Sequence, residues 1–213
     1  MDRNCLLLWI FTSMRKKAEG CDCGVTELGG SEIYMSKMII LVGSVRKGGN
    51  TELLAKAFAD GAGQKHDVEL VSVADYSIHP CVGCNGCYTS EGHRCVQRDD
   101  MDIIYEKLRQ ADIVIIASPV YFYGISAQLK GLIDRLHTPM RKNFHIKSLG
   151  LLLVGAATLP DLFEPLIAQY RMILRFFGLN DVGMVLVSGA REKGDVLKGD
   201  GIKRAYELGR NIM

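Results

Sequence analysis

The chain has 213 residues, the length of one domain with an appendage, and its formal net charge is only +2. Apolar residues make up 48% and charged residues 23%, as in soluble globular proteins. The small net charge excludes a large basic surface for nucleic acid, and no apolar run approaches the length of a membrane span. We therefore expect a cytoplasmic protein with neither nucleic acid nor membrane as a partner.

Residues 1–36 differ in pattern from the rest of the chain. The apolar run Leu6–Phe11 is followed rather than preceded by basic residues, and no convincing A-x-A cleavage site appears, so a signal peptide is not expected. Three interpretations remain: a flexible tail, a helical arm that packs on a partner subunit, or a start codon assigned too far upstream. We favour the third, because Met35 and Met38 lie where the first strand is expected. The folded domain is predicted to comprise residues 37–213.

The first expected strand, Met38–Gly43, is a continuous apolar run, typical of a strand buried on both faces in a parallel sheet. A polar loop, Ser44–Thr51, follows it, and residues 52–59 then have helical spacing. The first amides of a helix lack intrahelical partners, and the helix dipole adds partial positive charge there. The loop therefore predicts an anion site, at which Gly48 and Gly49 would allow a close backbone approach at positive φ.

Four side chains of this loop suit a phosphate group. Ser44, Asn50 and Thr51 offer short polar groups, and Arg46 can hold two phosphate oxygens at once. The alternative is an ordinary strand-to-helix turn capped by Asn50 or Thr51. The loop matches neither G-x-G-x-x-G nor G-x-x-x-x-G-K-[ST], so neither a dinucleotide fold nor a nucleoside triphosphatase is expected.

Strands and helices alternate along the rest of the chain. The further strands are expected at Asp67–Val73, Asp112–Ala117, Ser148–Val154 and Asp181–Ser188. The further helices are expected at Met101–Gln110, Ile125–Leu136, Asp161–Phe177 and Gly201–Ile212. This alternation predicts a three-layer α/β fold with a five-stranded parallel sheet and no second domain. Ligands of such sheets bind beyond the carboxyl ends of the strands, where the loops after them gather.

A second loop at this edge, Ser118–Gly124, carries three consecutive aromatic residues after a proline. Aromatic side chains are good surfaces for a flat ring, although packing against helices is the alternative explanation for each of them. A phosphate site beside a ring platform fits a mononucleotide such as FMN.

Three motifs together resemble the flavodoxin-like NAD(P)H-dependent FMN reductase family: Gly43-Ser44-x-Arg46-Lys47-x-Gly49-Asn50-Thr51, Ser118-Pro119-Val120-Tyr121 and Gln128-Leu129-Lys130-x-Leu132-Ile133-Asp134-Arg135. The resemblance extends from Met38 to about Met213, and it implies the strand order 2-1-3-4-5. It also implies a cofactor site. Its phosphate ligands would be Ser44, Arg46, Asn50 and Thr51, with Lys47 and Gly49 beside them. Its contacts to the isoalloxazine would be Pro119, Val120, Tyr121, Phe122, Tyr123, Gly124, Gly155 and Ala156.

Four of the seven cysteines form the run Cys81-x2-Cys84-x2-Cys87-x7-Cys95 in the long loop between residues 74 and 100. Thiols with this spacing can surround one inorganic centre. Structural zinc also takes four cysteines, though usually as two separated pairs, and disulfides are not expected in a reducing cytoplasm. The run resembles the iron–sulfur flavoprotein branch of the family, which implies a [4Fe–4S] cluster.

The resemblance implies an FMN-dependent oxidoreductase that takes hydride from NAD(P)H and reduces a small-molecule or quinone-type acceptor. The flavin carries the chemistry, so no catalytic side chain is predicted. One alternative is an electron-transfer iron–sulfur flavoprotein reduced by a protein partner such as ferredoxin, and another is a cysteine-based metal or redox sensor. The family resemblance and the aromatic turn together predict a homodimer or homotetramer.

Overall fold

The computed structural model describes residues 35–213. The predictions for the segment that precedes Met35 lie outside the described residues. No helix within residues 35–213 is long and apolar enough to cross a membrane.

One parallel sheet of five strands organises the described residues, in the order β2-β1-β3-β4-β5. This confirms the predicted α/β fold and strand order. β1 pairs with both β2 and β3, so the switch point in the strand order lies beside β1. The strands are β1 (Lys37–Val42), β2 (Asp67–Ser72), β3 (Ile113–Pro119), β4 (Ser148–Val154) and β5 (Asn180–Val187).

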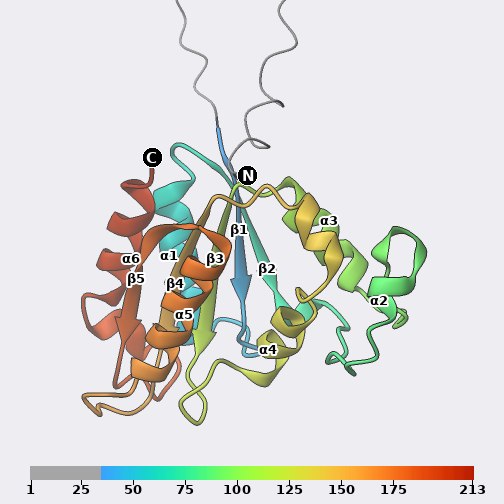
Figure 1. The fold of residues 1–213 in the computed structure, drawn as a ribbon. Coiled ribbons are helices and arrows are strands. Elements are labelled where there is room, and N and C mark those ends of the chain that lie inside the picture. The colour runs from blue at the N-terminus through green and yellow to red at the C-terminus, as the bar shows by residue number, and fades with distance from the viewer. Residues whose placement is uncertain (1–34) are drawn as a thin grey trace, which may run out of the picture. The chain divides into compact units, whose positions relative to one another are not determined.

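Helices cover both faces of the sheet, as Figure 1 shows. α1 and α6 lie on one face, and α3, α4 and α5 lie on the other. The α-helices are α1 (Asn50–Ala62), α2 (Gly86–Thr89), α3 (Met101–Gln110), α4 (Ala127–Asp134), α5 (Glu164–Phe177) and α6 (Gly201–Arg210).

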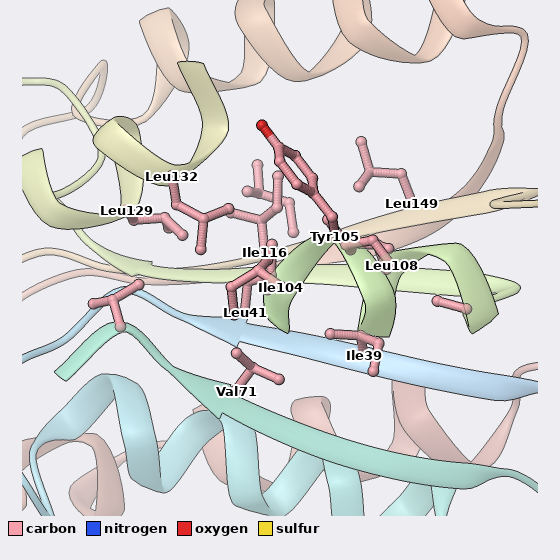
Figure 2. Close-up of a cluster of buried hydrophobic side chains, with 14 of the residues drawn as sticks. Ile39, Leu41, Val71, Ile104, Tyr105, Leu108, Ile116, Leu129, Leu132 and Leu149 are labelled. Carbon is pink, nitrogen blue, oxygen red and sulfur yellow. The ribbon is translucent and has the colours of Figure 1, made fainter. Parts of the chain in front are cut away.

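After Lys37, strand β1 is apolar because its alternate side chains enter two separate cores. Met38 and Ile40 pack in the cluster beneath α1 and α6, whereas Ile39 and Leu41 pack in the cluster beneath α3 and α4. Figure 2 shows the second cluster, in which α3 contributes Tyr105 and its neighbours opposite the strand side chains. Burial on both faces thus explains the continuous apolar run in the sequence.

The structure corrects the start of two helices. α4 begins at Ala127 rather than Ile125, because the Ser126 hydroxyl accepts a hydrogen bond from the Leu129 amide at 3.3 Å and so caps the helix. α5 begins at Glu164 rather than Asp161, with Pro165 in its first turn, where a missing amide hydrogen costs nothing. The one-turn helix α2 and the four short 3-10 turns within residues 35–213 were not expected.

α1 and α6 meet at a reciprocal pair of glycines. A Cβ atom on Gly61 would lie 2.1 Å from the Tyr206 carbonyl oxygen, and one on Gly209 would lie 2.2 Å from the Phe58 carbonyl oxygen. Real Cβ atoms essentially never come this close, so the two backbones could not keep this approach with any larger residue at either position.

We expect Gly61→Ala to destabilise the fold by about 1–3 kcal/mol, since the added methyl group overpacks a backbone contact. Gly131→Ala in α4 is the matched control, because a Cβ there would meet nothing closer than Pro80 at 3.8 Å. The control should stabilise the fold by about 0.5–1 kcal/mol through helix propensity. Urea denaturation measures both changes, and stability shifts of the same sign would contradict this account of the contact.

Candidate functional site

A pocket of about 240 Å³ lies at the carboxyl end of the sheet, between the loop that joins β1 to α1 and the end of β3. Nine of the predicted cofactor residues line it: Ser44, Arg46, Gly49, Asn50, Thr51, Pro119, Val120, Tyr121 and Ala156. Its other lining residues, which the sequence analysis did not single out as ligands, are Val154, Ala190, Arg191 and Lys193. The structure therefore brings the carboxyl ends of β1, β3 and β4 together with residues 190–193.

The N-terminus of α1 presents unpaired backbone amides at this pocket. Gly49 occupies the N-cap position and has no side chain that could cap the helix. The first intrahelical hydrogen bond runs from the Leu53 amide to the Gly49 carbonyl oxygen, at 3.0 Å. The preceding amides of Asn50, Thr51 and Glu52 have no acceptor among residues 35–213. Neither Asn50 nor Thr51 caps the helix, which excludes the alternative of an ordinary capped turn, and the donors stay available for an anion.

The two glycines of the loop serve different purposes. Gly48 has a φ of +66°, as predicted, but Gly49 has a φ of −77° and is not left-handed. Glycine is required at position 49 for space, because a Cβ there would lie 3.0 Å from the Arg46 carbonyl oxygen. The Gly48 amide donates to the Glu52 carboxylate at 2.6 Å. The pKa of the Glu52 carboxyl group is lowered, first by its hydrogen bond with Lys56 and second by this bond from Gly48.

The side chain of Asn50 is a structural clamp and not a free phosphate ligand. Its Nδ2 donates to the carbonyl oxygens of Ala190 at 3.3 Å and Glu192 at 2.8 Å. Its Oδ1 accepts from the amides of Gly194 at 2.9 Å and Val196 at 3.3 Å. These four bonds use the full capacity of the amide group, so we correct the predicted role: only the backbone of Asn50 can serve a ligand.

Three cationic side chains line the pocket, and only one of them was predicted. Arg46 is exposed, and its guanidinium has no partner among the described residues. Arg191 and Lys193 come from the segment that Asn50 clamps, and Lys193 Nζ donates to the Lys47 carbonyl oxygen at 3.2 Å. The spacing of the sequence could not reveal them, because they lie about 140 residues from the α1 loop.

Lys47 does not line the pocket. Its Nζ forms an exposed ion pair with Asp75 at 2.8 Å, and this hydrogen bond raises the pKa of Lys47. The predicted role of Lys47 as a cofactor ligand is therefore not supported by its position, and it remains available as a control residue.

The predicted aromatic platform is a tight turn in which only Tyr121 reaches the pocket. Tyr121 and Gly124 exchange backbone hydrogen bonds of 2.9 and 3.0 Å, and the two residues between them are left-handed, with φ of 50° for Phe122 and 62° for Tyr123. Such values are rare for aromatic residues and indicate local strain. Phe122 is fully exposed, and neither it, Tyr123 nor Gly124 lines the pocket.

Gly155 also lies outside the pocket lining, although Ala156 belongs to it. A Cβ at position 155 would lie 2.4 Å from the Leu162 side chain, so glycine is needed there for packing. The sequence analysis predicted that Gly155 contacts a ligand, whereas the structure shows Leu162 packed against it.

The four predicted metal ligands lie on the loop that leaves β2. Cys81 and Cys84 are exposed, Cys87 and Cys95 are partly buried, and all four are free thiols. Within residues 35–213, no three cysteine, histidine or carboxylate side chains are grouped closely enough to hold a metal ion. The Gly83 amide points at the Cys81 sulfur at 3.5 Å, which is the kind of contact that a thiolate accepts.

A larger cavity of about 460 Å³ lies elsewhere, between α5 and the α3–α4 side of the sheet. Its walls are mainly apolar, and they include residues at the start of strands, such as Val114 and Leu149. It lies away from the loops that gather at the carboxyl edge, so we do not assign the predicted site to it despite its volume.

The sequence of this chain matches the family of NADPH-dependent FMN reductases over residues 36–191. An iron–sulfur flavoprotein of Methanocaldococcus jannaschii is 41% identical over 57% of this chain and 63% of its own length. An iron–sulfur flavoprotein of Archaeoglobus fulgidus is 33% identical over 83% of this chain and 78% of its own length.

Among solved structures, an NAD(P)H:quinone oxidoreductase from Methanothermobacter marburgensis has a similar fold. The TM-score is 0.68 at 19% identity, over 84% of this chain and 100% of that one. This likeness agrees with the flavodoxin-like strand order described above. The chain belongs to the family of NADPH-dependent FMN reductases, which are flavin-dependent oxidoreductases.

Proposed function

We propose that the protein uses FMN to transfer electrons from NAD(P)H to a small-molecule, quinone-type acceptor. The observation that carries this proposal is the pocket at the β1–β3 edge, where the unpaired amides at the start of α1 and three cationic side chains occur together. This donor set has the chemistry of a phosphate site, and the family supplies the identity of the mononucleotide.

Each part of the pocket has a role in holding the cofactor. The amides of Asn50, Thr51 and Glu52 and the guanidinium of Arg46 bind the phosphate, and Ser44 lines the same region. When bound, FMN supplies the hydride-accepting and electron-transferring chemistry that side chains lack. Small-molecule sites usually measure about 300–1,000 Å³, so a pocket of about 240 Å³ is large enough for the phosphate end of FMN but not for the whole cofactor. The flavin ring would then lie outside the pocket, beside the exposed turn at Tyr121.

The class of acceptor rests on chemistry and on similarity. No residue lining the pocket is a buried acid or base poised for proton transfer, which suits an acceptor that takes electrons from the flavin directly. The similar fold of a quinone oxidoreductase supports a quinone-type acceptor, and we extend that chemistry to this chain as a proposal.

We further propose that the cysteine loop holds a [4Fe–4S] cluster. The donor chemistry fits, because four thiols lie within residues 81–95 and the backbone is left-handed at Gly83, Asn85 and Gly92, where the chain must curl. The thiols do not converge in the conformation described for residues 35–213, so loading requires the exposed loop to close around the iron. The two iron–sulfur flavoproteins to which the chain is similar support this assignment.

The cysteine loop also favours a second candidate, an electron-transfer protein that accepts single electrons from a ferredoxin. An iron–sulfur centre moves one electron at a time, whereas a nicotinamide delivers two as hydride. The choice of electron donor distinguishes the two functions.

The cofactor proposal is tested by Arg46→Ala, with Lys47→Ala as the matched control. The loss of one charge-assisted contact to phosphate should weaken FMN binding about ten- to a hundredfold. Riboflavin, which has no phosphate, should bind nearly as before, and Lys47→Ala should leave FMN affinity near that of the wild type because Lys47 pairs with Asp75. Flavin fluorescence quenching measures the affinities of the wild type and both variants for each ligand. Equal losses for FMN and riboflavin would show that Arg46 acts on the fold.

The redox proposal is tested by visible absorption of protein purified without oxygen and reconstituted with iron and sulfide. We expect bound flavin plus about four irons per chain, as a cubane on four cysteines requires. NADPH or NADH added under argon should bleach the flavin rapidly. Cys84→Ser should lose the iron and keep FMN, because the phosphate loop is a separate element.

Bleaching by reduced ferredoxin but not by either nicotinamide would establish the electron-transfer function instead. Stoichiometric zinc without iron, or four free thiols after reconstitution, would rule out the cluster. A colourless chain that takes up no FMN would contradict the enzyme and favour a cysteine-based sensor.

We propose that the active form is a homodimer or homotetramer, in which a second subunit covers the exposed aromatic turn. Phe122 and Tyr123 extend beyond the pocket with their side chains 102% and 47% exposed. Light scattering of the FMN-loaded protein at micromolar concentration should therefore give at least twice the chain mass, and Phe122→Ser should shift the assembly toward monomer. A flavin-loaded wild-type monomer would contradict the proposal.

A further inference from the structure

Residues 190–196 lie between β5 and α6 and form one wall of the pocket at the carboxyl edge of the sheet; we call them the clamped segment. Both ends of the clamped segment are buried in the core beneath α1 and α6, where Ala190 is 7% exposed and Val196 is 1% exposed. Between these ends, Arg191 and Lys193 are exposed and line the pocket. The clamped segment is therefore anchored at both ends, and its middle carries two positive charges.

The side chain of Asn50 holds the clamped segment against the start of α1. All four of its hydrogen bonds end on this segment, two on carbonyl oxygens and two on amides. Every partner is a backbone group, so these bonds fix the path of the backbone whatever side chains the segment carries. Replacing Asn50 by an apolar residue would therefore release the segment without changing any charge in the pocket.

Lys193 lies directly against the loop that joins β1 to α1. Its Nζ donates to the Lys47 carbonyl oxygen at 3.2 Å. A Cβ on Gly48 would lie 3.1 Å from Lys193 Nζ and 3.2 Å from Lys193 Cε, so the absence of a side chain at position 48 makes room for this lysine. The Lys193 ammonium group is therefore within hydrogen-bond distance of the loop whose following amides are free to bind an anion.

The three cationic side chains of the pocket lack a counter-ion. Within residues 35–213, no carboxylate forms an ion pair with Arg46, Arg191 or Lys193. Two lysines that do not line the pocket, Lys47 and Lys198, each pair with an aspartate, at 2.8 and 2.7 Å. Like charges around one pocket repel each other, and a phosphate monoester with close to two negative charges would relieve that repulsion.

We propose that Arg191 and Lys193 are further binding residues for the phosphate of FMN, and that Asn50 is the positioning residue that holds them at the pocket. This inference rests on the proposed cofactor. The α1 amides and Arg46 belong to the first strand-to-helix loop, and the clamped segment adds charged donors from the last one. Because the Asn50 side chain acts through the clamped segment, its effect on FMN affinity should depend on whether the two cations are present.

The test is a double-mutant cycle in which flavin fluorescence quenching measures the affinities for FMN and for riboflavin. The double variant Arg191→Gln/Lys193→Gln should weaken FMN binding about a hundredfold, since each lost charge-assisted contact is worth about tenfold. Asn50→Ala should weaken FMN binding about tenfold in the wild type but less than about threefold in the double variant. Riboflavin, which has no phosphate, should bind nearly as before to every variant. Lys198→Gln is the matched control and should leave FMN affinity unchanged, because this exposed lysine does not line the pocket.

An unchanged FMN affinity in the double variant would overturn the role of the two cations, whose exposed side chains can be replaced without disturbing the core. Equal losses from Asn50→Ala with and without the cations, or equal losses for FMN and riboflavin, would show that Asn50 acts on the fold and would overturn its positioning role. If Asn50→Ala does not fold, Asn50→Ser takes its place with the same expected pattern. A wild type that binds no FMN would overturn the proposed cofactor together with this inference, whereas FMN bound equally well by the wild type and the double variant would overturn this inference alone.

Discussion

The site depends most on the side chain of Asn50, which joins the start of α1 to residues 190–196. Its bond to Ala190 spans 140 positions of the chain, and the nitrogen and oxygen of its side-chain amide each make two hydrogen bonds, which is their full capacity. Because Arg191 and Lys193 belong to the clamped segment, these bonds also place positive charge beside the helix amides. The candidate anion site is therefore assembled from the first and the last strand-to-helix loops, which the folded sheet brings together.

Burial distinguishes two arginines of the chain, Arg46 and Arg135. Arg46 is exposed to solvent, so a phosphate that arrives from solution would replace water around its guanidinium. Its contribution to the binding free energy is therefore only the difference between its interactions with phosphate and with water. Arg135 is buried with Asp99, and breaking such a pair strands a charge away from water. The first arginine suits a ligand that comes and goes, whereas the second is held within the fold by its ion pair with Asp99.

The sequence was sufficient for the sheet, because strands buried on both faces must be apolar throughout and loops after parallel strands must share an edge. It also identified most of the pocket. The failures concern the direction of side chains: Lys47 turns to Asp75, Asn50 turns to the backbone, and the space at Gly155 is filled by Leu162. These outcomes depend on partners distant in the chain, which no local pattern encodes.

The two helical layers differ in how they fill the space above the sheet. α1 and α6 approach to backbone contact at Gly61 and Gly209, whereas the second half of α5 borders a cavity of about 460 Å³ and carries the exposed Phe176. Close-packed interiors resist compression, and internal voids are the volume that a folded protein surrenders under hydrostatic pressure. Because this cavity opens to solvent beside Phe176 and Phe177, the α5 layer is the loosely packed side of the molecule, while the α1–α6 layer is close-packed.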